Sequence, residues 1–598
     1  MTDLELLREY EPIVRFTAGE QFFPCAVDEY VKGCSLWLRD PAGRSRLVVA
    51  RGALDLDRLA AHGGEPALSL RFVDAPLSAL EYRQWRHRPQ RVRFHAPGRL
   101  ARVPPWSRLL DSAFDLSLLV RGRVPGGTAA AAEVKYRALL TRDDRPVYYA
   151  RVVRAGGWTV LHYLFFYVMN DWRSTFHGAN DHEADWEQVF VYLYQTDDGR
   201  REPRWVAFAS HDYHGDDLRR RWDDPLLLKD GAHPVVFAAA GSHASYFERG
   251  EYVMGVEPGF LRPVKRLAAG LRRFWVERLR QGGLDAVDRT IDALINVPFI
   301  DYARGDGVAI GPGGDRDWTP FLVSDDVPWV DRYRGLWGLD TQDPFGGERA
   351  PAGPKYNRDE SVRLSWFDPL GFAGMNKVLP PPEQPPALQR RRDQLAVEIE
   401  ELDGRIAERR RAVQTLALDV DALRATERSS AVHEQAAAVL RAAEAELASL
   451  KARRNRMTRI GEALDRYSGS VHAGVPDPPD AHLRHVHAPD STPAPHRALQ
   501  VWAALSGGVV LLAVVVLVAV VPAHAVFWAV VFGLCFATVE AAAAGRLTDF
   551  LLSVAIVLAV ITAFILAREF WRWLVVIMLG VGIVIMIHDN LRELAGDR

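Results

Sequence analysis

The residues best suited to chemistry lie in the stretch 182–187, His-Glu-Ala-Asp-Trp-Glu, which leads into a run of β-branched and aromatic residues. That composition favours a β-strand from Asp185 onward. Because side chains alternate between the two faces of a strand, Asp185 and Glu187 point the same way, roughly 6.5 to 7 Å apart. Two carboxylates this close repel each other unless a cation lies between them, and their oxygens suit Ca²⁺, Mg²⁺ or Mn²⁺. The stretch therefore predicts a divalent metal site, to which His182 adds a nitrogen ligand.

Further candidate ligands follow other strand-like runs. These runs end shortly before Asp171, His211 and His243. If Tyr194 pairs with Arg204 in a hairpin, the register places Glu187 opposite His211. The sequence thus predicts that four strand ends meet, with Asp171, His182, Asp185, Glu187 and His211 as metal ligands and His243 as an additional one.

The elements that position these residues belong to a β-rich region, residues 1–375, where short strand-like runs alternate with Gly, Pro and Asp. This spacing favours a β-sandwich-like domain over a doubly wound α/β fold. A chain of 598 residues with 48% hydrophobic residues is too long for one core, so several modules are expected. The net charge of −2 gives no reason to expect nucleic-acid binding, and three cysteines are too few for a disulfide framework.

Several of these segments also resemble a known family. They are Leu7–Phe16, Glu20–Pro24, the Phe165–Asp171 segment, the His182–Glu187 box, Gly241–Phe247 and Gly335–Gly338 with Gly353-Pro354. Together they resemble the vacuolar protein sorting-associated protein 62 family over residues 5 to 372. The box is also similar to the Gly-His-Arg-His-Asp-Trp-Glu heptapeptide of the necrosis-inducing protein family. That likeness implies a β-sandwich holding a divalent cation, with affinity for sphingolipid head groups. The box departs from the heptapeptide at Asp181, Glu183 and Ala184.

Residues 260–280 predict an amphipathic helix with a basic face that includes Lys265, Arg266, Arg272 and Arg273. Such a helix suits contact with an anionic membrane surface. The alternative is that it packs on the sandwich and leaves its basic face in water.

The region after the sandwich changes character. Residues 376–386 are a proline-rich linker, and residues 387–467 carry heptad repeats typical of a coiled coil. Two segments of similar length favour an antiparallel hairpin, and self-association into a longer dimeric rod is the alternative. Residues 468–496 are rich in Pro, His, Asp and Ser, which predicts a disordered linker.

The C-terminal region is strongly apolar. We expect four transmembrane helices within residues 497–588, at 498–521, 523–543, 550–567 and 570–587. In this four-span arrangement Arg497, Arg546, Arg592 and Arg598 fall on one side, and Arg568 and Arg572 fall on the other. The positive-inside tendency therefore predicts a multi-pass membrane protein whose N-terminal domain is cytosolic. Glu540 lies in the second predicted span, where we interpret it as reaching toward the interface near Arg546.

Three functional classes remain open from sequence alone. The first is a membrane-anchored module that binds a polar ligand, such as a lipid head group or glycan, in membrane organisation or trafficking. The second is a metal-dependent hydrolase in which Glu183, Asp212 or His214 is the general base. The third is a structural membrane scaffold. No residue pattern requires turnover, so the sequence favours binding over catalysis.

Overall fold

The structure is a computed structural model of the chain. It describes residues 1–598 except 66, 97–98, 104, 121, 123, 173–180, 211–212, 257–296, 340–349, 427–430, 476, 486–487, 491–496, 521–523, 544–546 and 595–598. The chain forms two compact units. Unit 1 comprises Met1–His95 and Arg123–Ser491, and unit 2 comprises Ala96–Gly122 and Thr492–Arg598.

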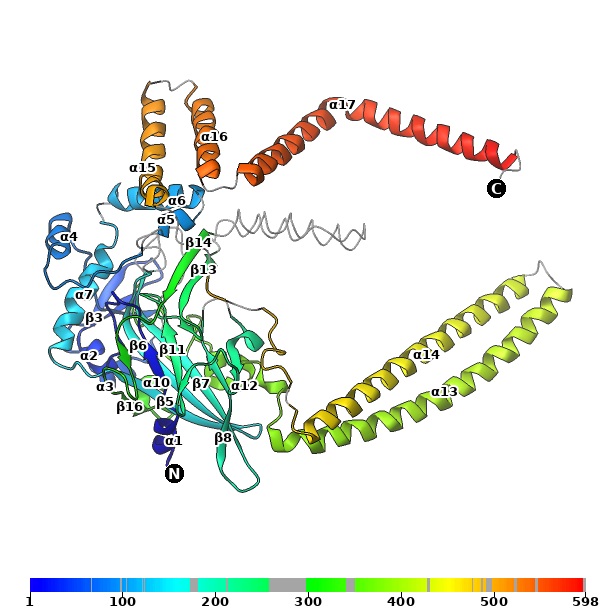
Figure 1. Cartoon of the computed structure of the whole chain (residues 1–598), viewed down its shortest axis with the longest axis horizontal. Coiled ribbons are helices and arrows are strands. Elements are labelled where there is room, and N and C mark those ends of the chain that lie inside the picture. Colours follow the sequence, from blue (N-terminus) through cyan, green and yellow to red (C-terminus); the bar gives the residue numbers. More distant parts are fainter. Residues whose placement is uncertain are drawn as a thin grey trace. The chain divides into compact units, whose positions relative to one another are not determined.

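Unit 1 is built on two main sheets (Figure 1). The six-stranded sheet has the order β16 (Thr319–Leu322), β5 (Val147–Ala155), β6 (Trp158–Asn170), β7 (His182–Gln195), β8 (Arg201–Phe208) and β9 (Arg219–Arg221). The other has the order β10 (Lys229–Asp230), β11 (His233–Ala238), β1 (Ile13–Arg15) and β15 (Ala309–Ile310), with β12 (Ser245–Tyr246) beside β11. The predicted β-rich N-terminal region is confirmed.

These two sheets pack against each other through a shared hydrophobic core. Tyr167 of β6 and Val189 of β7 lie in one buried cluster with Val14 of β1 and Val236 of β11. This packing works because alternate residues of β6 and β7 face the second sheet. The same face carries Asp185, which pairs in register with Tyr167.

The opposite face of the six-stranded sheet is also covered. Phe166 and Trp186 pack there against α2 (Val27–Lys32), α7 (Gly127–Leu140) and a small sheet. The small sheet has the order β3 (Ser45–Val49), β2 (Ser35–Arg39) and β4 (Leu68–Arg71), and β13 (Gly250–Val256) pairs separately with β14 (Val297–Ala303). The shorter helices of unit 1 are α1 (Asp3–Glu9), α3 (Leu56–Ala61), α4 (Ala79–Arg86), α10 (Pro328–Asp331), α11 (Leu364–Phe367) and α12 (Pro369–Phe372). Burial on both faces explains why most of β6, and β7 from Val189 to Tyr194, are almost continuously apolar.

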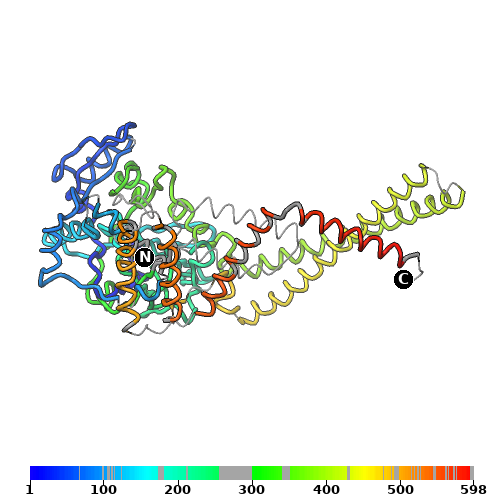
Figure 2. Tube along the Cα trace, turned by 90° about the horizontal axis from the view of Figure 1, so that it is seen from above, coloured from blue at the N-terminus to red at the C-terminus, as the bar shows by residue number. Residues whose placement is uncertain are grey.

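The predicted coiled coil is an antiparallel hairpin of α13 (Gln384–Thr426) and α14 (Ala431–His472) (Figures 1 and 2). Leu402 and Ile406 of α13 are buried against Leu450 of α14. Ion pairs also link the two helices, Arg392–Asp465, Arg409–Glu446 and Arg454–Asp403. The pairing is therefore made within one chain.

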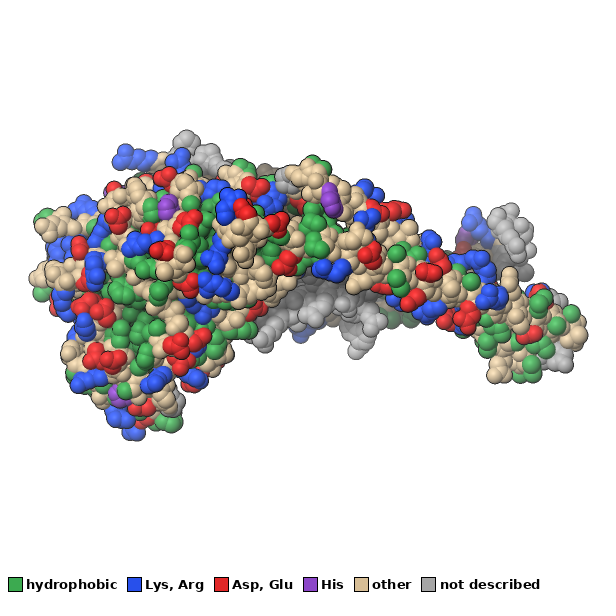
Figure 3. Space-filling model, turned by 90° about the horizontal axis from the view of Figure 1, so that it is seen from below, with side chains coloured by type: hydrophobic (Ala, Val, Ile, Leu, Met, Phe, Trp, Pro, Cys, Tyr) green, Lys and Arg blue, Asp and Glu red, His purple; other side chains and the backbone are tan. Residues whose placement is uncertain are grey.

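Figure 3 shows acidic and basic side chains interspersed over the visible surface.

The segment after the hairpin differs from the predicted disordered linker over 468–496. α14 itself extends to His472. Beyond it, the Asp477 carbonyl accepts a hydrogen bond from Arg221 Nη1 at 2.7 Å, and His482 Nε2 donates to the Arg219 carbonyl at 2.9 Å. The Asp217 carboxylate accepts the backbone N–H of Arg484 at 2.8 Å. These bonds hold the segment against residues 217–221, which include β9.

Unit 2 joins an internal segment to the C-terminal helices. Its helices are α5 (Arg99–Arg102), α6 (Pro105–Val120), α15 (Arg497–Val520), α16 (Ala525–Ala543) and α17 (Leu547–Leu594). Within the described residues, Leu499–Leu517 and Val575–Arg592 have the length and apolar composition of a membrane span, and Val530–Ala542 is a shorter apolar helix.

The prediction of four spans is wrong. The expected break at Arg568-Glu569 falls inside α17, which is one helix of 48 residues. Charged Arg and Glu side chains are good helix formers, so they lower hydropathy locally without ending the helix. Only two segments of the described chain then qualify as candidate spans by length and composition.

Candidate functional site

The strand ends that the sequence singled out are neighbours in the sheet. β6 ends at Asn170, directly before Asp171, and β7 begins at His182. Asn170 and His182 are paired in register. Asp185 and Glu187 pair with Tyr167 and Phe165, and so they share one face as predicted.

Asp185 and His243 meet across the two main sheets. His243 lies in the turn between β11 and β12, and its Nδ1 donates to Asp185 Oδ2 at 2.9 Å. The ring stacks on Tyr167 with centroids 3.7 Å apart and planes 7° apart. His243 is fully buried, and its backbone φ of 58° lies in the left-handed region that non-glycine residues rarely adopt. Such a conformation persists only where the surroundings hold it, as the Asp185 contact does here.

Glu20 completes a buried charge cluster with His243 and Asp185. Its Oε1 lies 3.8 Å from His243 Nε2, which is an ion-pair distance and too long for a hydrogen bond. Burial by itself lowers the pKa of His243, but the hydrogen bond to Asp185 and the charges of both carboxylates outweigh it and raise that pKa to about 9. His243 is therefore an imidazolium at neutral pH. It balances one of the two carboxylate charges.

Sequence reasoning did not identify Glu20 as a site residue. Its carboxylate accepts the backbone N–H groups of Gln21 (2.7 Å), Phe22 (2.9 Å) and Gly241 (2.7 Å). The Gly241 carbonyl in turn accepts the Asp171 N–H at 2.9 Å. Glu20 thus connects the N-terminal segment to the candidate site. The only feature of the sequence that could have pointed to Glu20 is its position at the start of the Glu20–Pro24 segment.

His182 has the hydrogen-bonding pattern of a metal-binding histidine. Its Nδ1 is 2.8 Å from the Ala184 carbonyl, which only accepts, so Nδ1 carries the proton. Nε2 then presents a lone pair, and it is buried with no hydrogen-bond partner in the described part of the chain. Metal-ligating histidines usually donate their second ring N–H to such a carbonyl or to a carboxylate. The side-chain amide of Asn170, the register partner of His182, is buried without a hydrogen bond within the same described residues.

The Glu183 carboxylate hydrogen-bonds to backbone groups and does not contact the other candidate ligands in the described residues. Its carboxylate accepts backbone N–H groups from Phe72 (3.0 Å), Val73 (2.6 Å) and Leu339 (3.2 Å). Burial raises its pKa to about 7, against the opposing effect of these three hydrogen bonds. The carboxylate joins β7 to the end of β4, so its contacts give no support to a role as general base. His214, another candidate base, is exposed.

β7 and β8 pair as the predicted hairpin, but the predicted register is wrong. Tyr194 pairs with Glu202 rather than Arg204, and the register shifts again at a bulge between Tyr192 and Leu193. Bulges add a residue to one strand, and sequence periodicity does not locate them. The expected Glu187–His211 pair depended on the unshifted register.

Two groups of predicted residues lie outside the described part of the chain. They are His211 with Asp212, and the basic residues Lys265, Arg266, Arg272 and Arg273. Over the residues that are described, no group of three His, Cys, Asp or Glu side chains has the geometry of a metal site. The metal site therefore stays a prediction.

Comparisons of the whole chain with known proteins found no matching family model, no matching curated protein and no matching solved structure.

Proposed function

We propose that the chain is a membrane-anchored binding protein whose unit 1 holds a divalent cation, Ca²⁺, Mg²⁺ or Mn²⁺, and recognises a polar ligand such as a lipid head group or glycan. The observation that carries the proposal is the buried His182 Nε2, which faces no donor in the described residues while Nδ1 is committed to a carbonyl. The lone pair of such a nitrogen can bind a metal cation. The similarity of the 182–187 box to the heptapeptide of the necrosis-inducing protein family, which implies a divalent cation and affinity for sphingolipid head groups, supports the same role.

The charge balance supports a cation as well. Glu20, Asp171, Asp185 and Glu187 are each less than a tenth exposed. Burial raises the pKa of the Tyr167 hydroxyl, and the negative charges of Glu187, Asp185 and Glu20 raise it further. Among the described residues, His243 is the cation that pairs with Asp185 and Glu20. Carboxylate oxygens are the ligands that hard divalent cations prefer.

Metal binding is expected to stabilise the chain. Full-length protein in detergent, stripped with a chelator, should gain about 2.7 kcal/mol of unfolding free energy at a hundredfold excess of the bound metal over its dissociation constant. His182→Ala removes a ligand and Asp185→Asn removes a charge, so each should lower the metal affinity by about tenfold or more. The metal-dependent stabilisation at a given metal concentration should fall accordingly. Thermal unfolding with MnCl₂, MgCl₂ or CaCl₂ measures the shift.

The matched control is Asp198→Asn, an exposed carboxylate in the β7–β8 turn that pairs with Arg200. It should leave the metal-dependent shift unchanged. If His182→Ala folds and keeps the full shift, the cation does not bind at this strand end.

The membrane part of the proposal rests on exposed apolar surface. The window Val575–Arg592 is wholly unburied in the structure, and an apolar helix of this length suits a membrane. We place unit 1 in the cytosol on the arrangement in which α15 and α16 cross the membrane as a pair, because Arg497 and Arg546 then flank that pair on the same side. Reporters fused before Met1 and after Arg598 should both report the cytosol, and alkaline carbonate should not extract the chain from membranes. An extracellular signal from the first reporter would reverse the orientation.

A further inference from the structure

A large cleft lies on the small sheet of unit 1, apart from the predicted metal ligands. Its volume is about 980 Å³, and none of Asp171, His182, Asp185, Glu187 or His243 lines it. The walls come from β2, β3 and β4, from the α3–β4 loop and from the segments 331–339 and 358–360. This volume is at the upper end of the range typical of small-molecule sites.

Strand alternation explains why the floor of the cleft is polar. Leu36, Leu68 and Leu70 are buried in the core on one face of the β3–β2–β4 sheet. The other face carries Arg39 and Trp37 of β2, with Ser45 paired to Arg39 and Ser69 paired to Trp37. Arg71, two residues beyond Ser69 on β4, lies on this face as well.

Arg71 is held in place by stacking and makes no ion pair within the described residues. Its guanidinium lies over the Trp37 ring, 4.1 Å from the centroid, and its Nε is buried with no hydrogen-bond partner within the described residues. Burial lowers the pKa of Arg71, and the charge of Glu183 opposes that effect only in part. A stacked, partly desolvated guanidinium with an unused N–H is suited to receive an anion.

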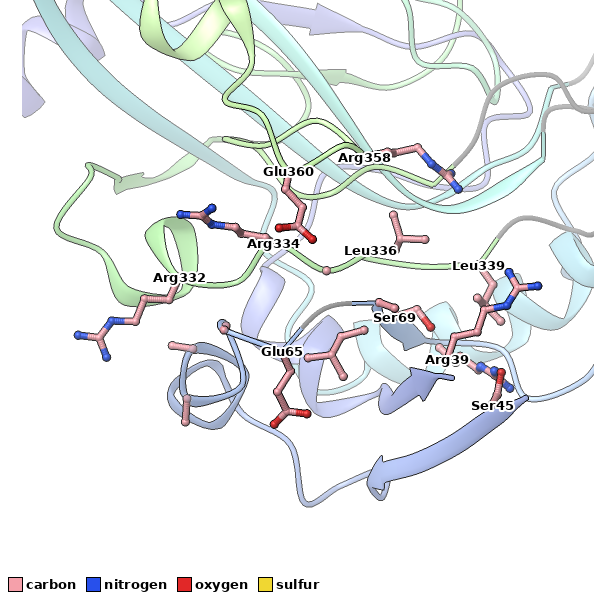
Figure 4. Close-up of a pocket in the computed structure, with 18 of the residues that line it drawn as sticks. Arg39, Ser45, Glu65, Ser69, Arg332, Arg334, Leu336, Leu339, Arg358 and Glu360 are labelled. Atoms are coloured by element: carbon pink, nitrogen blue, oxygen red, sulfur yellow. The ribbon is translucent and has the colours of Figure 1, made fainter. Parts of the chain in front are cut away.

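The lining as a whole has excess positive charge. Its arginines are Arg39, Arg71, Arg332, Arg334 and Arg358, and its acids are Glu65, Asp331 and Glu360. Glu65 already pairs with His62 at 2.7 Å, and Asp331 pairs with Lys355 at 2.7 Å. Figure 4 shows Arg39 beside Ser45 at one end of the cleft with Arg358 on the opposite wall, whereas Arg332 points outward at the other end.

We propose that this cleft binds a phosphomonoester, whose phosphate is held by Arg39 and Arg71 and by the hydroxyls of Ser45 and Ser69. The planar guanidinium fork matches two phosphate oxygens, and a dianion balances two arginines where a carboxylate balances one. The remaining volume accommodates the organic part of the ligand. This assignment does not depend on the proposed cation.

Calorimetric titration of the full-length chain in detergent tests the assignment. The probes are inorganic phosphate, glycerol 3-phosphate, glucose 6-phosphate and acetate. Saturable binding of the esters is expected, and Arg39→Gln and Arg71→Gln should each weaken it about tenfold or more, as the loss of a charge-assisted hydrogen bond implies. Preference for glycerol 3-phosphate points to a lipid head group, and preference for glucose 6-phosphate points to a phosphorylated sugar.

Arg46→Gln is the matched control. Arg46 is exposed, follows Ser45 on the same strand and does not line the cleft, so this change removes one charge from the same sheet without touching the site. It should leave ester affinity unchanged. If Arg46→Gln and Arg39→Gln weaken ester binding equally, the effect comes from net charge, and the cleft is not the binding site. Acetate or inorganic phosphate binding as tightly as the esters would overturn the phosphomonoester assignment. Arg39 is exposed, so its variant keeps the test valid if Arg71→Gln does not fold.

Discussion

Glu540→Ala is expected to destabilise unit 2 by about 3 to 5 kcal/mol, because it leaves Arg108 buried without its counterion. Glu540 is 5% exposed and Arg108 is 3% exposed, and the two form an ion pair. Trp502 Nε1 also donates to Glu540 Oε2 at 2.8 Å, and Arg108 Nη1 donates to Ser506 Oγ at 2.9 Å. The cluster thus joins α6, α15 and α16 through one carboxylate.

A double-mutant cycle separates the pair from its surroundings. Arg108→Leu with Glu540→Leu should be more stable than either single variant, because no buried charge is left alone. Denaturant unfolding in detergent measures each variant. Glu569→Ala, an exposed acid of α17, is the control and should change the unfolding free energy by less than about 0.5 kcal/mol. If Glu540→Ala costs no more than this control, the ion pair has no structural role.

Stability is expected to fall as pH rises, owing to two buried groups in unit 1. His243 has a folded pKa of about 9, above its ordinary value of 6.5, so the folded state holds this proton more tightly. Its contribution, about 3 kcal/mol from the difference in pKa, is complete below pH 6.5 and is lost as pH rises through 9. Glu183 behaves in the same direction, because burial raises its pKa from 4.5 to about 7. Its contribution is complete below pH 4.5 and is lost as pH rises through 7.

Urea unfolding of the full-length chain across pH 4.5 to 9, in detergent and chelator, measures this profile. Glu183→Gln should flatten the lower part of the profile, and His243→Gln should flatten the part above pH 6.5. His214→Gln, at an exposed histidine, should leave both parts unchanged. Unfolding free energy that rises between pH 6.5 and 9 would mean that His243 is neutral in the folded chain.

The sequence predicted the elements that depend on local pattern. The density of β-branched and aromatic residues located β6 and β7, and the heptads located α13 and α14. Asp185 and Glu187 share a face because side chains alternate along any strand. These features are set by neighbours in the sequence, so their spacing is visible without a fold.

The features that sequence reasoning missed depend on partners distant in the chain. Glu540 was assigned to the interface near Arg546, but its partner is Arg108, 432 residues away. Glu20 reaches Gly241 and His243 only after β1 and β11 have aligned. The Asp477–His485 segment has a disordered composition, yet Arg221 and Asp217 supply the hydrogen bonds that fix it. No periodicity encodes contacts of this kind.

The α13–α14 hairpin has both of its ends on the same sheet, which makes it an arm of adjustable length. At 1.5 Å per residue its helices span about 65 Å. The outgoing end is fixed near the β5–β6 turn, where Trp158 Nε1 donates to the Val378 carbonyl at 3.0 Å, and the returning end is fixed by the bond from Arg221 to Asp477. Removing two heptads from each helix would shorten the arm by about 21 Å and leave both anchor points in place. The distance reached by the tip can therefore change in evolution without any change in the sheets of unit 1.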